Sequence, residues 1–247
     1  MIKSTPTRQG RLKALRRQIA KAASFSVRSE GIAPFGMPEV DACLNGGLAR
    51  GALHEIAAAD HRSIPAALGF LLTLTNHSEK ACVLWPLAKT VQAFGQPYGP
   101  GLKFFGVDPA RIVFVRCATA RECLWAMEEG LHLGGIAAVI GARAKAMDLT
   151  ASRRLQLAAE QAHTPVFLLR PYNDHAPSAA VTRWRVSPAP SAHDEFGFTK
   201  NARFRVALEY ARGGKTGEWL MEWDHGALHL RLSSVLGDRA AGKTRAA

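Results

Sequence analysis

Long uncharged apolar runs are absent from this sequence. None approaches the roughly 18 residues that a membrane-spanning helix needs, so we expect no membrane span. The basic segment 1–23 is not followed by the apolar stretch of a secretory signal, so secretion is not expected either. A transit peptide, which is also basic and amphipathic, stays open on composition alone.

Cysteine is scarce, with four residues that show no paired spacing. Cys82 and Cys117 lie in apolar runs, which is typical of buried, reduced thiols in a cytoplasmic protein. Histidine, cysteine and acidic residues form no cluster with the spacing of metal ligands. We therefore expect a cytoplasmic protein that holds neither a metal ion nor a cofactor.

Acidic residues are also scarce. The chain has 20 of them against 32 lysines and arginines, a net charge of +12. Residues 1–30 alone carry eight basic residues and one acid, which contributes +7. This charge favours an anionic partner, either nucleic acid or an acidic protein surface, although a merely solvated basic face remains the alternative.

The N-terminal segment has the pattern of a basic helical arm, residues 1–30. Leu12, Leu15 and Ile19 recur at helical spacing within residues 7–24, and six basic side chains lie between and around them. Such a helix can dock on a partner or lie on a DNA backbone. Its candidate contacts are Arg8, Arg11, Lys13, Arg16, Arg17 and Lys21.

Apolar strands alternate with helical patterns through the middle of the chain. Runs that are apolar throughout, rather than every second residue, indicate a parallel sheet buried on both faces. The sequence predicts a short helix at 38–44, strands at 52–58, 81–87, 111–117, 135–142 and 164–170, and helices at 64–77, 118–134 and 149–162.

The pattern changes after Pro171. Alternation at 181–186 and 204–210, and a hairpin over 218–232 that turns at 224–226, predict an antiparallel extension at 179–232. We expect one α/β domain at 31–235, with a parallel core to about residue 170 and helices on both faces of its sheet. A disordered tail is expected at 236–247.

A phosphate-binding loop is missing from the place where this fold would carry one. The first strand leads into Ala59, Asp60, His61, Arg62 and Ser63, which include no glycine and no lysine. The tail does match G-x-x-x-x-G-K-[ST] at 237–244, but only three residues follow Thr244. We expect no nucleotide site in the tail, because the motif needs a helix that begins at its lysine.

The entry to the core resembles the RecA family. GGLARGALHE at 46–55 and FFGVDPARIVFVRC at 104–117 carry this resemblance, which implies a RecA-like core over about residues 36–170. The catalytic carboxylate of that family falls near 85–88, where no acid stands, and its magnesium-associated acid falls near Gly141. Together with the missing loop, these losses predict a RecA-like fold without ATP hydrolysis, and so no enzyme.

A second resemblance covers nearly the whole chain. PFG-x-P-x-x-D at 34–41, LWAMEE at 124–129, DLTASRRLQLAAE at 148–160 and the Glu-Trp repeats at 218–223 resemble the ImuA family. This resemblance implies a bacterial, RecA-like and SulA-like accessory factor of damage-induced (SOS) translesion synthesis. The implied partners are an ImuB-like relative of Y-family polymerases and an error-prone replicative-type polymerase, near the nucleoid during repair. Contacts with DNA and RecA, and self-association, stay open.

Two further pairs are candidate contacts for DNA or a partner. Arg153 and Arg154 stand at a helix start, where their charge opposes the helix dipole and packing explains them poorly. Trp219 and Trp223 share one face of a strand and could form a partner-facing patch, although core packing is the usual role of such a pair.

Two other functions remain open at this point. One is a SulA-like inhibitor of cell division, since SulA is another RecA relative without nucleotide chemistry. The other is a DNA-stimulated ATPase with an atypical site at 60–63.

Overall fold

The structure is a computed structural model. It describes residues 31–75, 82–88, 97–133, 135–143, 145, 147–193, 195–196 and 200–237. The expected basic arm and most of the expected tail lie outside these ranges.

Five α-helices are present in the described chain, with short 3₁₀ turns before α3 and β5. The helices are α2 (Pro38–Cys43), α3 (Ile64–Leu74), α4 (Gly99–Phe104), α5 (Ala120–Leu133) and α6 (Leu149–Ala162), and the 3₁₀ turns are η2 (His61–Ser63) and η5 (Pro109–Arg111). The sequence did not predict α4, because its Gly-Pro-Gly start indicates a turn. For α6 the Asp148 carboxylate is the N-cap and accepts a hydrogen bond from Ala151 N at 2.7 Å.

A nine-stranded sheet forms the centre of the domain, in the order β11-β10-β9-β8-β3-β7-β6-β4-β5. Its strands are β3 (Leu53–Ala58), β4 (Cys82–Ala88), β5 (Ile112–Cys117), β6 (Ile136–Ala142), β7 (Val166–Arg170), β8 (Thr182–Ala189), β9 (Ala202–Ala211), β10 (Gly217–Asp224) and β11 (His229–Gly237). A separate two-stranded sheet joins β1 (Ile32–Ala33) to β2 (Leu48–Ala49).

The large sheet is mostly parallel, as the sequence predicts. All pairings from β5 to β3 are parallel, and β9, β10 and β11 add antiparallel strands. One boundary differs from the expectation: β8 pairs in parallel with β3, with His54 opposite Thr182. The parallel part therefore continues through β8, and the antiparallel extension begins at β9. In addition, β11 runs to Gly237, so residues 236 and 237 are strand rather than tail.

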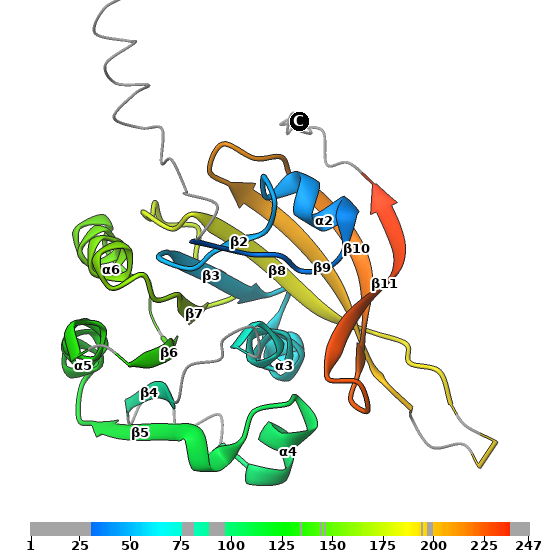
Figure 1. Ribbon diagram of the computed structural model, residues 1–247, viewed down its shortest axis with the longest axis horizontal. Helices are drawn as coiled ribbons and strands as arrows, with labels where there is room; N and C mark the ends of the chain where they lie inside the picture. Colours follow the sequence, from blue (N-terminus) through cyan, green and yellow to red (C-terminus); the bar gives the residue numbers. More distant parts are fainter. Residues whose placement is uncertain are drawn as a thin grey trace, which may run out of the picture.

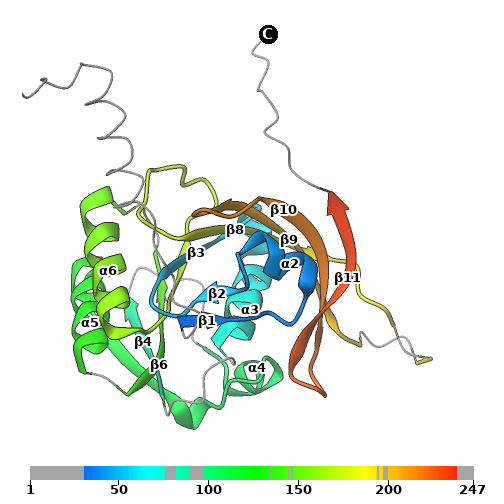
Figure 2. The same ribbon diagram turned by 45° about the horizontal axis from the view of Figure 1, so that its top comes forward.

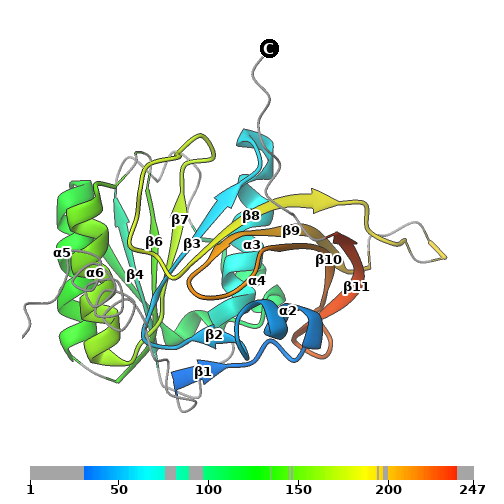
Figure 3. The same cartoon turned by 90° about the horizontal axis from the view of Figure 1, so that it is seen from above.

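One face of the sheet is covered by α3, around which β8 to β11 curve (Figures 1 and 3). Phe70 of α3 is fully buried there. Side chains alternate along β10, so Trp219 and Trp223 both point inward, and Trp184 of β8 lies 6.4 Å from Trp219 between ring centroids. The antiparallel strands thus form a wall of the core.

The other face is covered by α5 and α6, which form the outer layer (Figure 2). Met127 of α5 and Leu155 of α6 are buried against Leu53, Val139 and Leu168 of the parallel strands. Helices therefore lie on both faces, which confirms the predicted α/β architecture. This arrangement leaves the carboxyl ends of β3 to β7 at one edge of the sheet, where α/β proteins bind their ligands.

Candidate functional site at the carboxyl edge of the sheet

The junction between β3 and α3 is closed by its own side chains. Ala59 N donates to Val186 O at 2.8 Å, which continues the strand pairing into the loop. Asp60 then caps the following turn: its Oδ1 accepts hydrogen bonds from the backbone N and the hydroxyl of Ser63, both at 2.8 Å. A carboxylate of the chain therefore occupies the helix start, where free N–H groups would be needed to hold a phosphate.

Electrostatics make this junction unfavourable to anions. The Ser63 hydroxyl, and then the Ser63 backbone N–H, lower the pKa of the Asp60 carboxyl, with a smaller contribution from Arg62. Asp60 is therefore ionised at neutral pH and repels a second anion. Pro65, in the first turn of α3, removes one more N–H donor. The residues from Ala59 to Ser63 thus form a self-capped turn between β3 and α3.

The two positions at which the resemblance to the RecA family leads one to expect an acid carry buried residues of other kinds. Gly141 of β6 is buried, and a Cβ there would lie 2.1 Å from Met127 Cε and 2.9 Å from Leu168 Cδ1. Trp85 of β4 is only 3% exposed and fills the second position. A side chain at Gly141 would therefore require the ends of the Met127 and Leu168 side chains to move, and an acid there would be buried among apolar groups.

Glu55, the one acid in β3, is held in a buried ion-pair network. Its Oε2 lies 3.1 Å from Arg170 Nη1 and 3.2 Å from Arg183 Nε, while Ser178 Oγ donates to Oε1 at 2.7 Å. Asp174 in turn lies 3.4 Å from Arg170 Nη2. Both carboxylate oxygens of Glu55 are therefore engaged, and the network ties β3 to β7 and β8 rather than presenting a base to a substrate.

A cavity of about 620 Å³ opens next to the closed junction. It lies between α3, α4, the strands β4 and β5, and the chain that follows β7. Its volume is in the range of ligand-binding pockets. His61 belongs to both places, since it follows Asp60 in the junction and also lines the cavity. The sequence did not predict this cavity, because six separate segments contribute to its wall.

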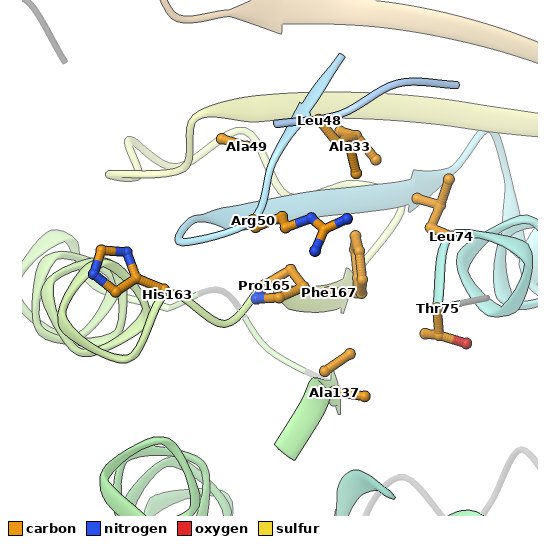
Figure 4. A pocket seen from close by; sticks show the side chains of 11 residues that line it. Ala33, Leu48, Ala49, Arg50, Leu74, Thr75, Ala137, His163, Pro165 and Phe167 are labelled. Carbon is orange, nitrogen blue, oxygen red and sulfur yellow. The ribbon is translucent and has the colours of Figure 1, made fainter. Parts of the chain in front are cut away.

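A second, small pocket of about 60 Å³ lies at the opposite edge of the sheet. Arg50 extends into it beside Phe167, with Pro165 and His163 nearby (Figure 4). This volume holds a few waters at most and is too small for a cofactor.

His54 lies behind this pocket as a structural residue. Its ring nitrogens contact Thr182 Oγ1 and Ala49 O, each at 2.8 Å. Complete burial lowers the pKa of His54 to about 4, and the contact with the Ala49 carbonyl offsets only part of this effect. The imidazole is therefore neutral and donates to Ala49, which leaves the other nitrogen to accept from Thr182.

The predicted contact residues outside the junction lie in different places. Trp219 and Trp223 are 2% and 1% exposed, and Trp223 Nε1 donates to Phe104 O at 2.7 Å. This burial corrects the expectation of a partner-facing patch, because these side chains build the core. Arg154 forms an ion pair with Glu128 of α5, while Arg153 is exposed on the outer layer. The six candidate contacts of the N-terminal arm lie outside the described residues.

Several further features bear on function. Within the described chain no group of three or more His, Cys, Asp or Glu residues could hold a metal ion. Burial, and then the neighbouring Cys117, raise the pKa of the Cys123 thiol to about 12, so it is no nucleophile. None of the helices among the described residues is long and apolar enough to cross a membrane.

Comparison with known proteins identifies the family. No family model matches the sequence. Protein ImuA of Caulobacter vibrioides (strain NA1000 / CB15N) is 38% identical over 226 residues, which covers 83% of this chain and 89% of that protein. Protein ImuA of strain ATCC 19089 / CIP 103742 / CB 15 matches to the same extent. This chain belongs to the ImuA family. The family predicted from the sequence motifs is thereby confirmed, and the closed β3–α3 junction is a feature of an ImuA family member.

Proposed function

We propose that this chain is a non-catalytic accessory protein of damage-induced mutagenic DNA synthesis, with a RecA-like domain that no longer processes nucleotides. The carrying observation is the Asp60–Ser63 cap: a family member implied to act in mutagenesis has closed the place where a nucleotide would bind. The surroundings of Gly141 support the same proposal, because glycine carries no acid and the side chains of Met127 and Leu168 fill the space beside it.

The proposed partners are an ImuB-like protein and an error-prone polymerase of the same assembly, in the cytoplasm and close to DNA. The outer layer of α5 and α6 offers a surface for such a contact. Trp125 is 62% exposed, Leu149 53% and Leu157 48%, although all three are large and apolar. Large apolar side chains that are exposed on a helical layer are typical of protein–protein interaction sites.

Co-purification with the ImuB-like protein of the same genome tests this proposal. We expect a complex of the full chain that survives high salt, because apolar contacts are not screened. Substitution of Trp125, Leu149 and Leu157 by serine should weaken it. Matched substitutions of Leu228 and Leu236, 48% and 42% exposed at the far end of the sheet, should not.

Removal of residues 171–247 would be a poor test of where the partner binds, and the point variants above are preferable. That truncation deletes β8 to β11, and with them the buried Trp184, Trp219 and Trp223. A lost complex would then report unfolding. If the full chain forms no complex at any salt concentration, the accessory role fails. Filamentation of cells on overproduction would then favour a SulA-like activity instead.

A further inference from the structure

The cavity at the carboxyl edge has an unusual wall. Five aromatic side chains line it: Trp85, Tyr98, Phe105, Phe114 and Tyr172. Its basic side chains are His61, Arg116, Arg143 and Arg170, and no carboxylate of the described chain lines it. Arg170 is paired with Glu55 and Asp174, so the positive charge available to a ligand lies at the other arginines. The wall therefore combines π-faces with positive charge.

Three of these five rings are also exposed to solvent. Tyr98 is 72% exposed, Phe114 40% and Tyr172 39%, so they stand at the mouth of the cavity. Arg116 is also exposed, two residues beyond Phe114 on the edge strand β5, and it forms no ion pair with any described residue. An aromatic rim with an uncompensated cation beside it is accessible to a ligand from solvent.

One buried donor in the wall also lacks a partner. Trp85 is 3% exposed, and its indole Nε1 has no hydrogen-bond acceptor among the described residues. A buried N–H without an acceptor is unfavourable, and such groups are rare in folded proteins. This nitrogen has almost no accessible surface, so Trp85 contributes its ring rather than its N–H to the wall of the cavity.

We propose that this cavity binds single-stranded DNA, with bases stacked on the exposed rings and phosphates beside Arg116 and Arg143. The proposal rests on the proposed function, which brings the protein to DNA under synthesis. Aromatic platforms interleaved with cations are the usual means of binding single strands without sequence preference. Duplex DNA does not fit, because its bases are stacked inside the helix and cannot reach the rings.

The proposed ligand differs from a bound nucleotide triphosphate. A triphosphate needs free N–H groups at a helix start, and Asp60 already accepts from the Ser63 N–H of η2 while Pro65 of α3 has no N–H to offer. The cavity offers instead a series of rings that suits several bases of one strand. An acidic peptide would use the arginines but would leave the five aromatic side chains without a role.

Fluorescence anisotropy with a labelled oligothymidylate of about 16 nucleotides tests the proposal on the full chain. We expect the double variant Tyr98→Ala/Phe114→Ala to bind at least about tenfold more weakly. The matched control is Tyr210→Ala, a tyrosine 43% exposed on β9 away from the cavity, and it should bind like the wild type. Thermal unfolding of each variant checks the fold, since all three side chains are exposed.

The N-terminal arm also attracts DNA by charge, so the measurement is made at roughly 0.2 M salt, where phosphate contacts weaken and stacking persists. Arg116→Gln should lower the slope of log affinity against log salt by about one. Arg205→Gln, an arginine 59% exposed on β9 whose Nη1 lies 3.5 Å from Glu218, is the control and should leave the slope closer to the wild-type value.

Four results would overturn the proposal. They are equal affinity of the double variant and the wild type, equal affinity for duplex and single strand, binding of thymidine monophosphate as tight as that of the oligonucleotide, and displacement by oligoglutamate at the same concentration. Co-purification of the double variant with the ImuB-like protein separates the two proposals. A complex that persists while DNA binding is lost sustains both, whereas DNA binding without any complex refutes only the accessory role.

Discussion

Two neighbouring places at the carboxyl edge of the sheet have opposite chemistry. The β3–α3 junction is closed, and Asp60 gives it negative charge. The cavity beside it is open, aromatic and basic. His61 borders both. The difference teaches that two kinds of surface stand side by side at this edge: the chain's own carboxylate fills the β3–α3 turn, while the adjoining recess presents aromatic and basic side chains.

The largest effect is expected from returning an acid to the edge. Gly141→Asp should lower the free energy of unfolding by more than about 4 kcal/mol, because it adds both a steric clash with Met127 and an unpaired buried charge. Urea denaturation measures this change. Gly99→Asp is the control, since its Cβ would make ordinary contact at 3.7 Å and its charge would face a helix start. Wild-type stability of Gly141→Asp would contradict this expectation.

The buried ion pair behind the cavity should give the next largest effect. Arg170→Met leaves Glu55 with one partner fewer in a nearly dry environment, which costs about 3 kcal/mol. Arg154→Met breaks an ion pair whose arginine is 65% exposed, and should cost less than about 1 kcal/mol. If urea denaturation gave similar losses of unfolding free energy for the two variants, the buried Glu55 network would stabilise the fold no more than a surface ion pair does.

His54 should make stability depend on pH. Its pKa is about 4 in the folded chain and 6.5 when exposed, so the unfolded state binds the proton first. The stability that comes from burying His54 in its neutral form is fully present above pH 6.5. As the pH falls from 6.5 toward 4, the free energy of unfolding decreases by about 3 kcal/mol in total. His54→Gln should flatten unfolding free energy in this window relative to the wild type. Parallel pH profiles of the two proteins would contradict the assignment.

The smallest effect is expected at the closed junction. Asp60→Ala removes the cap of η2 and should lower the midpoint of thermal unfolding slightly, since Asp60 is exposed. The change frees the Ser63 N–H but supplies neither glycine nor lysine, so a fluorescent ATP analogue should still not bind. Tight magnesium-dependent binding by this variant would show that Asp60 alone closes the site.

Much of the fold follows from local pattern. The buried strands were predicted to within about two residues, because runs such as 136–142 are apolar throughout and end at glycine or charge. The alternation of 181–186 predicted the strand observed as β8 but not its neighbour, since a period of two residues says nothing of pairing direction. This is why the parallel pairing of β8 was missed.

Of the candidate site, the sequence predicted the β3–α3 junction but not the cavity beside it. The lack of glycine and lysine at 59–63 is visible in the sequence, but the Asp60 cap depends on local geometry. The aromatic cavity depends on tertiary structure, because Tyr98, Phe114 and Tyr172 come from separate segments. One signal was available: between Lys80 and Arg121 the only acid is Asp108.

The central claim is that this edge of the sheet no longer turns over nucleotides. The most direct measurement is steady-state ATP hydrolysis by the full chain with magnesium, with and without single-stranded DNA. We predict that, with and without DNA, the rate of ATP hydrolysis equals the background rate measured without protein. A rate above that background, stimulated by DNA and abolished by Ser63→Ala, would contradict the account and support an ATPase with an atypical site.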